Sequence, residues 1–271
     1  MMRTQPYVAA PFRWARAKNI GPSHQVRGLP CQDAVSVRTF AGRDGNTWIT
    51  AALSDGAGCA PHAEAGSAYA VQCFNEFIIE ALSEFDINTG PELEDILNRG
   101  VNLVKETITE VANNKARSAN TYAATFLGCV SRVGLAGFVQ IGDGAILIGE
   151  TDEWQLAVPP YEGMYANEAC FVTDTAMQER IELKITENTP KTILMLSDGL
   201  EDLLIGGAKK DIKAPLPNLL SEALEVSPKD GLYVALCVRL KELLQSKSVT
   251  SRSDDDTSII AISHKQQAKD I

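Results

Sequence analysis

The stretch Ala51-Ala-Leu-Ser-Asp-Gly-Ala-Gly58 is a short apolar run that ends abruptly in an acid followed by two glycines. The tripeptide Ser-Asp-Gly returns at residues 197–199, directly after the apolar run Thr192–Leu196. A third acidic group, Asp254–Asp256, stands immediately before the apolar run Thr257–Ile262. Because strands are rigid, side chains at their ends can be held on one point. We therefore expect these three carboxylate sites to meet at strand edges in the fold.

Carboxylates that gather at one place destabilise a fold unless a cation or a proton neutralises them. Two unit charges about 4 Å apart repel each other by roughly 4 kcal/mol at an effective dielectric constant near 20. Oxygen ligands suit hard ions such as Mg2+ and Mn2+ rather than zinc or copper. A single Asp-Gly is most often a turn, but three acidic sites beside apolar strands favour a site for Mg2+ or Mn2+.

The composition is that of an ordinary globular protein and excludes several functions. The chain has 271 residues, 45% of them hydrophobic and 22% charged, which allows a substantial core in one domain. A net charge of −10 without a Lys/Arg cluster argues against a nucleic-acid surface. No apolar run approaches the roughly 20 residues that span a membrane, and no signal peptide is visible. We expect a cytoplasmic monomer, without nucleic-acid or membrane partners, whose six cysteines are free thiols.

The first half of the chain combines a hairpin with two long helices. Ala34–Phe40 and Thr47–Leu53 flank the turn-forming segment Gly42–Asn46, which predicts an antiparallel hairpin. Ala63–Leu82 and Pro91–Val111 carry apolar residues at helical spacing on one face each. A sheet that begins as a hairpin disfavours an all-parallel fold, and each amphipathic helix is expected to cover one sheet face.

The remaining segments complete an α+β fold. Further strands are expected at Tyr122–Ser131, Leu135–Ile141 and Ala145–Gly149, as a meander, and at Trp154–Pro160, Ile181–Ile185, Thr192–Leu196 and Thr257–Ser263. Helices are expected at Pro217–Val226 and Gly231–Gln245. Residues 1–20 predict an irregular lead-in anchored by Trp14, residues 21–30 a loop, and residues 161–180 a surface excursion with a mobile flap as one interpretation. The predicted architecture is an antiparallel β-sandwich with helix pairs on both outer faces, in one domain over residues 1–271 with a core at about 21–263.

Seven segments in a fixed order together resemble the metal-dependent protein serine/threonine phosphatases of the PP2C type, and most closely their bacterial branch. These segments are Gly21-Pro-Ser-His-Gln-Val-Arg-Gly-Leu-Pro-Cys-Gln-Asp33-Ala34, Leu53-Ser-Asp-Gly-Ala-Gly58, Ala123-Ala-Thr125, Gln140-Ile-Gly-Asp143-Gly-Ala-Ile146, Tyr165-Ala-Asn-Glu168, Leu196-Ser-Asp-Gly-Leu-Glu-Asp202 and Asp254-Asp-Asp-Thr257. Each segment alone is a weak signal, whereas the ordered set is specific. The family fold, a central β-sandwich flanked by helix pairs, agrees with the predicted architecture.

The resemblance implies two bound Mg2+ or Mn2+ ions and a set of ligands. Asp55 would bridge the two ions, and the carbonyl of Gly56 would coordinate one of them. Asp198 and one residue of Asp254–Asp256 would complete the more enclosed site, and Asp33 would hold metal-bound water.

In relatives, positions that match Asp143 and Asp202 form a weaker third metal site with Asp198. The spacing of four between residues 198 and 202 is that of one helical turn, which would set both carboxylates on the same side. The alternatives are a plain Gly-Asp-Gly turn for Asp143 and a solvated acid at a helix start for Asp202.

The implied reaction is the hydrolysis of phosphoserine or phosphothreonine in a protein that a serine/threonine kinase has phosphorylated. Water activated between the two ions would attack the phosphorus directly, without a phosphoenzyme intermediate. Asp33, Asp55 and Asp198 are therefore the candidate catalytic residues. The sequence contains no Gly-x-Ser-x-Gly and no thiol-phosphatase loop, which agrees with direct hydrolysis.

The chain departs from the family pattern at two positions. Gln32 stands where relatives often have an acid, and Ala57 stands where some carry a histidine that would serve as general acid. Either His24 or Arg27 could approach the substrate phosphate, and Arg27 is the candidate ligand because arginine binds anions better than histidine. The alternative for both is a loop residue in solvent. His24 is expected to be a solvent-exposed loop residue, and His62 a residue at a helix start.

The ligand within Asp254–Asp256 depends on register. If Ser258 takes the family's hydroxyl position the ligand is Asp255, and if Thr257 does so it is Asp254. We expect Asp255, because apolar residues then begin directly after the hydroxyl. Two other classes stay open: a catalytically weak or inactive relative that binds phosphoproteins as a regulatory module, and a structural module stabilised by metal. Mutually repelling acids argue against a pure binding protein.

Overall fold

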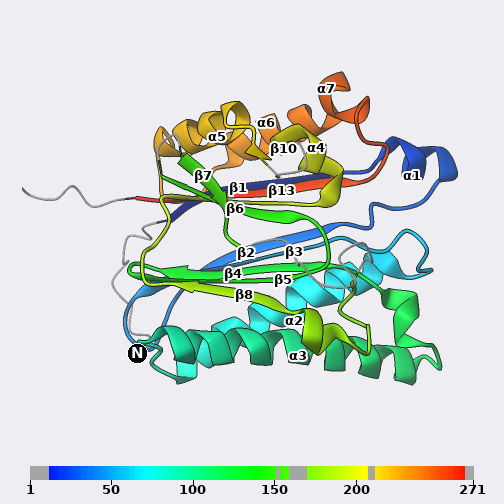
Figure 1. Ribbon diagram of the computed structural model, residues 1–271, viewed down its shortest axis with the longest axis horizontal. Helices are drawn as coiled ribbons and strands as arrows, with labels where there is room; N and C mark the ends of the chain where they lie inside the picture. The colour runs from blue at the N-terminus through cyan, green and yellow to red at the C-terminus, as the bar shows by residue number, and fades with distance from the viewer. Residues whose placement is uncertain (1–11, 151–152, 159–169, 207–210, 266–271) are drawn as a thin grey trace, which may run out of the picture.

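The computed structural model describes residues 12–150, 153–158, 170–206 and 211–265, and these form two packed sheets with a helix layer on each outer side (Figure 1). The six-stranded sheet has the order β12 (Gly231–Leu232), β1 (Phe12–Asn19), β13 (Thr257–His264), β9 (Thr192–Leu196), β6 (Ala145–Glu150) and β7 (Glu153–Leu156). The five-stranded sheet has the order β2 (Ala34–Ala41), β3 (Thr47–Ser54), β4 (Phe126–Arg132), β5 (Leu135–Ile141) and β8 (Glu182–Thr186). The predicted α+β sandwich is confirmed.

The four long helices form the outer layers. They are α2 (Ala63–Glu84) and α3 (Gly90–Asn114) on the five-stranded sheet, and α5 (Pro215–Glu225) and α6 (Val234–Gln245) on the six-stranded sheet. Short elements complete the described chain: α1 (Pro22–Arg27), α4 (Glu201–Leu204), α7 (Lys247–Thr250), the hairpin of β10 (Ile205–Gly206) and β11 (Asp211–Ile212), and 3-10 turns at Ala119–Tyr122, Met177–Arg180 and Asp198–Leu200.

Three apolar layers hold the sandwich together, and β9 shows how one strand serves two of them. Its five residues are all buried. Ile193 and Met195 pack into the core between the sheets, whereas Leu194 and Leu196 pack into the core beneath α5 and α6. Because successive side chains of a strand point to opposite faces, a strand that is covered on both sides is mostly apolar. The polar Thr192 at the start of β9 is buried as well, and its hydroxyl forms a hydrogen bond with the Ser221 hydroxyl at 2.7 Å.

Three expectations about secondary structure and strand pairing are wrong. Residues 12–19 form strand β1 rather than an irregular lead-in, although Trp14 is buried as expected, and residues 22–27 form helix α1 rather than a loop. The strands β4, β5 and β6 are not one meander, because β6 leaves the sheet of β5 and pairs with β7 and β9 in the other sheet. The turn at residues 142–144 therefore carries the chain from one sheet to the other.

Several other expectations fall wholly or partly outside the described residues. These are residues 1–11 of the lead-in, 159–160 of the predicted edge strand, the segment Tyr165–Glu168 and residues 161–169 of the predicted flap. Within the described ranges, no helix combines the length and the apolar character that crossing a membrane requires.

Helix α3 begins with a capping box that can be tested directly. The Thr89 hydroxyl accepts a hydrogen bond from the amide of Glu92, and the Glu92 carboxylate accepts one from the amide of Thr89. Thr89→Ala removes one of these bonds and is expected to lower stability by about 1 kcal/mol, or the melting temperature by about 2 °C. Thr89→Ser is the matched control, and an unchanged melting temperature in Thr89→Ala would contradict the role of the cap.

Candidate metal centre

Asp33 and Asp55 are brought together by the hairpin of β2 and β3. The antiparallel register pairs Ala34, the first residue of β2, with Ser54, the last residue of β3. Asp33 directly precedes Ala34 and Asp55 directly follows Ser54, so the two acids lie at the same end of the hairpin. Asp33 is buried, with 1% of its surface exposed, and Asp55 is half-buried.

Asp198 and Asp255 come from the corresponding end of the other sheet. Strands β9 and β13 are antiparallel, with Leu196 opposite Ile259. Beyond that pair, the amide of Ser197 donates to the carbonyl of Ser258 at 3.1 Å, and the amide of Ser258 donates to Oγ of Ser197 at 2.9 Å. The end of β9 is thereby fixed to the start of β13, and both sheets present their acids at one end of the sandwich.

The carboxyl group of Asp55 lies between those of Asp33 and Asp198. Burial, together with the negative charges of Asp33 and Asp198, raises the pKa of Asp55 to about 12. Burial likewise raises the pKa of Asp33 to about 7. Partial burial raises the pKa of Asp255, and the charge of Asp198 adds to this effect. The four groups therefore cannot all carry their charge unless a cation joins them.

The donor set fits a hard divalent cation. Both carboxylate oxygens of Asp33 and the Oδ1 of Asp198 are buried without a hydrogen bond of normal geometry in the described part of the chain, although the Ser197 and Ser258 hydroxyls lie close enough to Asp33 to oppose the rise of its pKa. Buried carboxylate oxygens are costly without a donor or a metal. Oxygen atoms from several carboxylates are the ligands that Mg2+ and Mn2+ prefer. These buried oxygens are the feature that a bound cation would account for.

The backbone around Asp55 is fixed by Thr125. The amide of Asp55 donates to Oγ1 of Thr125 at 3.2 Å, and the amide of Thr125 donates to the carbonyl of Asp55 at 2.8 Å. Gly56 follows, bridged to Ala124, and a Cβ at Gly56 would approach the backbone of Ala63 to 2.8 Å. Only glycine fits there. Thr125 had a visible sequence signal, its place in the Ala-Ala-Thr segment, but had not been given a role.

The three acids of the run at 254–256 have different environments. Asp254 is exposed, and its carbonyl oxygen accepts a hydrogen bond from the amide of Ser23 at 2.9 Å. Asp256 is fully buried and accepts two backbone hydrogen bonds, which makes it a structural residue. Asp255 lies at the surface within electrostatic reach of Asp198. This arrangement supports Asp255 over Asp254 as the acid that faces the centre.

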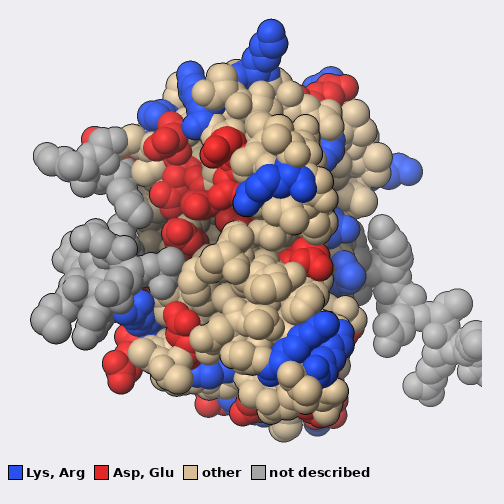
Figure 2. Space-filling model, turned by 90° about the vertical axis from the view of Figure 1, so that its right-hand side faces the viewer, with Lys and Arg blue, Asp and Glu red and all other residues tan. Residues whose placement is uncertain are grey.

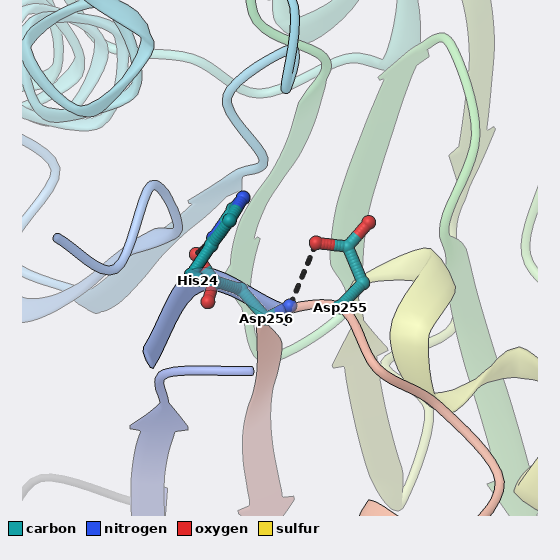
Figure 3. A group of neighbouring side chains, drawn as sticks. All are labelled: His24, Asp255 and Asp256. Carbon is teal, nitrogen blue, oxygen red and sulfur yellow. Dashed lines mark hydrogen bonds and ion pairs between the residues drawn. The ribbon is translucent and has the colours of Figure 1, made fainter. Parts of the chain in front are cut away.

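The environment of His24 corrects the expectation of a solvent-exposed residue. His24 is 2% exposed, and its Nδ1 lies 3.0 Å from Oδ2 of Asp256 (Figure 3). The expectation failed because the partner of His24 stands at the other end of the sequence. Figure 3 also shows the Asp255 carboxylate, whose Oδ1 accepts a hydrogen bond from the amide of Asp256 at 2.8 Å.

Three further candidates lie at the surface. Asp143 is exposed in the turn between β5 and β6, and Asp202 is exposed in α4. Asp198 and Asp202 are joined by a 3-10 turn followed by a short helix, so the spacing of four is not one regular α-helical turn. Arg27 is exposed at the last turn of α1, where its Nε donates to the carbonyl of Ser23 at 3.2 Å. His62 precedes α2 as expected, without a capping hydrogen bond.

The acids give this end of the molecule its electrostatic character. Figure 2 views the end that lies on the right in Figure 1 and shows Asp and Glu side chains gathered in a hollow of that face. A concentrated negative potential of this kind attracts cations and opposes the approach of a phosphate group. A phosphorylated ligand can therefore bind here only when cations have neutralised the acids.

Comparison with known proteins gives consistent matches. The family model described as protein phosphatase 2C matches residues 20–244. Serine/threonine-protein phosphatase 3 of Escherichia coli (strain K12) is 26% identical over 249 residues, which cover 92% of this chain and 96% of that protein.

Two solved structures show that the fold is shared. The serine/threonine phosphatase Stp1 from Staphylococcus aureus has a TM-score of 0.65 at 12% identity, with 98% of this chain and 100% of that chain covered. The catalytic domain of the serine threonine protein phosphatase PstP, in complex with two manganese ions, has a TM-score of 0.58 at 16% identity, with 93% and 97% covered.

The buried acids predict an unusual dependence of stability on pH in metal-free protein. Unfolded Asp33 loses its proton near its ordinary value of 3.8, whereas the folded form keeps it until about 7, so folding stability falls as the pH rises across that window. Asp55, whose folded pKa is also raised, acts in the same direction. In EDTA at pH 8, Asp55→Asn is therefore expected to be more stable than the unmodified protein by about 1 to 4 kcal/mol.

Urea unfolding at pH 4 and pH 8 measures this difference, which should shrink at the lower pH. Addition of Mn2+ should reverse the order, because only the unmodified protein then gains stability from binding. A metal-free Asp55→Asn protein that is less stable at pH 8 would contradict the electrostatic account.

Proposed function

The chain belongs to the protein phosphatase 2C family, and we propose that it hydrolyses phosphoserine and phosphothreonine in protein substrates with the help of two Mg2+ or Mn2+ ions. The observation that carries this proposal is the set of buried carboxylate oxygens without a hydrogen bond of normal geometry in the described residues, drawn from both sheets. The manganese-bound relative PstP supports the choice of cation.

The ligands that we propose are Asp33, Asp55, the carbonyl of Gly56, Asp198 and Asp255. When bound, the cations would supply a water nucleophile at neutral pH and neutralise charge on the phosphoryl oxygens. Asp55 is assigned to both ions because its carboxyl group adjoins those of both Asp33 and Asp198.

The protein is proposed to orient the ligands of the cations. Thr125 forms hydrogen bonds with both the amide and the carbonyl group of Asp55 and so fixes the direction of its carboxylate. Ser197 and Ser258 join the ends of β9 and β13 beside Asp33. We propose that water attacks the phosphorus in line, with Asp33 orienting it, and that no residue of the chain becomes phosphorylated. Preorganisation of this kind accounts for a large part of enzymatic rate enhancement.

Three exposed residues are assigned to the outer part of the site. Asp143 and Asp202 are proposed to hold a third, weaker ion with Asp198, since all three stand at this end of the sandwich. Arg27 is proposed to bind the substrate phosphate, which requires its guanidinium to leave the carbonyl of Ser23. Exposed acids bind cations weakly, so the third ion is expected only at high Mn2+ concentration.

Further proposals concern the whole protein. We propose that the chain forms one domain, because both sheets share a core and both supply ligands. The substrate is proposed to be a phosphoprotein made by a serine/threonine kinase. A monomeric state and a cytoplasmic location stay predictions from the sequence.

Hydrolysis of a phosphothreonine peptide in the presence of Mn2+ tests the proposed activity. Asp198→Asn keeps the shape of the side chain but removes its charge, and it is expected to lower kcat/KM by more than about 100-fold. Asp95→Asn, on the exposed face of α3, is the matched control. Metal-loaded, folded protein without turnover on any phosphopeptide would favour the inactive, phosphoprotein-binding alternative.

The adjacent residues Asp254 and Asp255 provide a second test, of which acid binds the cation. Asp255→Asn is expected to raise the Mn2+ concentration for half-maximal activity by about 10-fold or more, because the residue faces Asp198. Asp254→Asn is expected to leave it unchanged, because the side chain of Asp254 is exposed and its hydrogen bond to Ser23 is made by the backbone carbonyl. The opposite ranking of the two variants would assign the ligand to Asp254.

A further inference from the structure

Asp256 joins three segments of the chain with one buried carboxylate. None of its surface is exposed. Its Oδ1 accepts a hydrogen bond from the amide of Gly21 at 2.7 Å, and its Oδ2 accepts one from the amide of Gln32 at 2.5 Å. The Nδ1 of His24 lies 3.0 Å from the same Oδ2. The carboxylate thus binds the entry of α1, the segment that leads into β2, and the buried ring on α1.

These contacts fix the two acids that the proposed function takes as ligands. Gln32 directly precedes Asp33, and Asp256 directly follows Asp255. A carboxylate that holds the amide of Gln32 therefore sets the distance between the chain at Asp33 and the chain at Asp255. The amide of Asp256 also donates to Oδ1 of Asp255, which orients that carboxylate.

The segment that carries His24 has little freedom to move. The amide of Ser23 donates to the carbonyl of Asp254 at 2.9 Å. A Cβ added to Gly21 would lie 2.3 Å from the carbonyl carbon of Asp255, so the backbones are in direct contact and only glycine fits. His24 is therefore held against Asp256 by the backbone segment that directly precedes it.

A buried carboxylate is costly unless hydrogen bonds and an opposite charge or donor compensate it. The two amides satisfy one lone pair on each oxygen of Asp256, and Nδ1 of His24 lies 3.0 Å from Oδ2, in contact but without the angle of a normal hydrogen bond. Loss of the imidazole would remove a polar side chain that contacts this buried carboxylate, which would relax by moving away from Gln32 or Gly21.

His24, Asp255 and Asp256 also bring one ligand atom each within 4.8 Å of one another, which raises the alternative of a separate cation site. The hydrogen bonds argue against it. Both oxygens of Asp256 and Oδ1 of Asp255 already accept backbone N–H groups, which leaves each of these oxygens with fewer free lone pairs for a cation.

We propose that His24 and Asp256 are a positioning pair, which holds Asp33 and Asp255 at the separation that the divalent cation requires without touching the cation. The pair sets metal affinity rather than the chemistry of hydrolysis. This inference takes Asp33 and Asp255 as ligands from the proposed function, but it does not depend on which ester is hydrolysed.

Isothermal titration of the full chain with Mn2+ alone tests the pair. His24→Leu fills the space without a donor and is expected to weaken Mn2+ binding about 10-fold, the usual cost of losing a group that orients a ligand. His24→Asn retains a donor near the position of Nδ1 and is expected to bind within about threefold of the unmodified protein. At saturating Mn2+, kcat of His24→Leu should recover to within about threefold. His264→Asn, at the opposite end of β13, is the matched control with unchanged affinity.

The outcomes separate the alternatives. A lower melting temperature of metal-free His24→Leu with unchanged Mn2+ affinity would reduce the pair to a structural contact and overturn the proposal. An equal loss of affinity in His24→Leu and His24→Asn would make His24 a metal ligand and overturn it as well. If His24→Leu does not fold, His24→Gln, whose amide takes the position of Nε2 instead, provides the same comparison with His24→Asn. Unmodified protein that binds Mn2+ but hydrolyses no phosphopeptide would refute the proposed function and leave the affinity comparison valid.

Discussion

Repulsion among carboxyl groups that two sheets bring to one end of the sandwich is the constraint on which this structure depends. Asp33 and Asp55 lie at strand ends of one sheet and Asp198 lies at a strand end of the other. Packing the two sheets together therefore brings their carboxyl groups close to one another. Burial raises the pKa values of Asp33 and Asp55 because a charged carboxylate loses its hydration there. The apolar core between the sheets has to supply the free energy that holds these groups in place until a cation neutralises them.

The ends of the two sheets can hold the acids in fixed positions, because hydrogen bonds already hold the backbone there. Thr125 holds Asp55 through both backbone groups, and Ser197 and Ser258 hold the strands that carry Asp198 and Asp255. The acids therefore cannot relax by moving the chain, and only protonation or a cation relieves them. A site of this kind is preorganised, which is what electrostatic catalysis needs.

The sequence predicted the elements whose side chains alternate or recur at helical spacing, such as β2, β3, α2 and α3. It missed β1, because Arg13 and Arg16 interrupt the apolar pattern of that strand. In the fold, Arg13 pairs with Asp230 and Arg16 donates to the carbonyl of Val35, so distant partners make both charges tolerable inside a sheet. The place of β6 was equally unpredictable, because an apolar run suits either sheet and only packing decides between them.

The sequence by itself determined the donor groups of the candidate centre: carboxylates directly after or before buried strands and a glycine beside Asp55, a set that suits a hard cation. Only the tertiary structure distinguished the environments of the three acids at 254–256, with Asp256 buried and Asp254 and Asp255 exposed, and only it showed that His24 is buried rather than exposed. The reason is distance along the chain. The partners of Asp256 at Gly21 and Gln32 are 235 and 224 residues away, and no local pattern specifies which side chains such remote segments will meet.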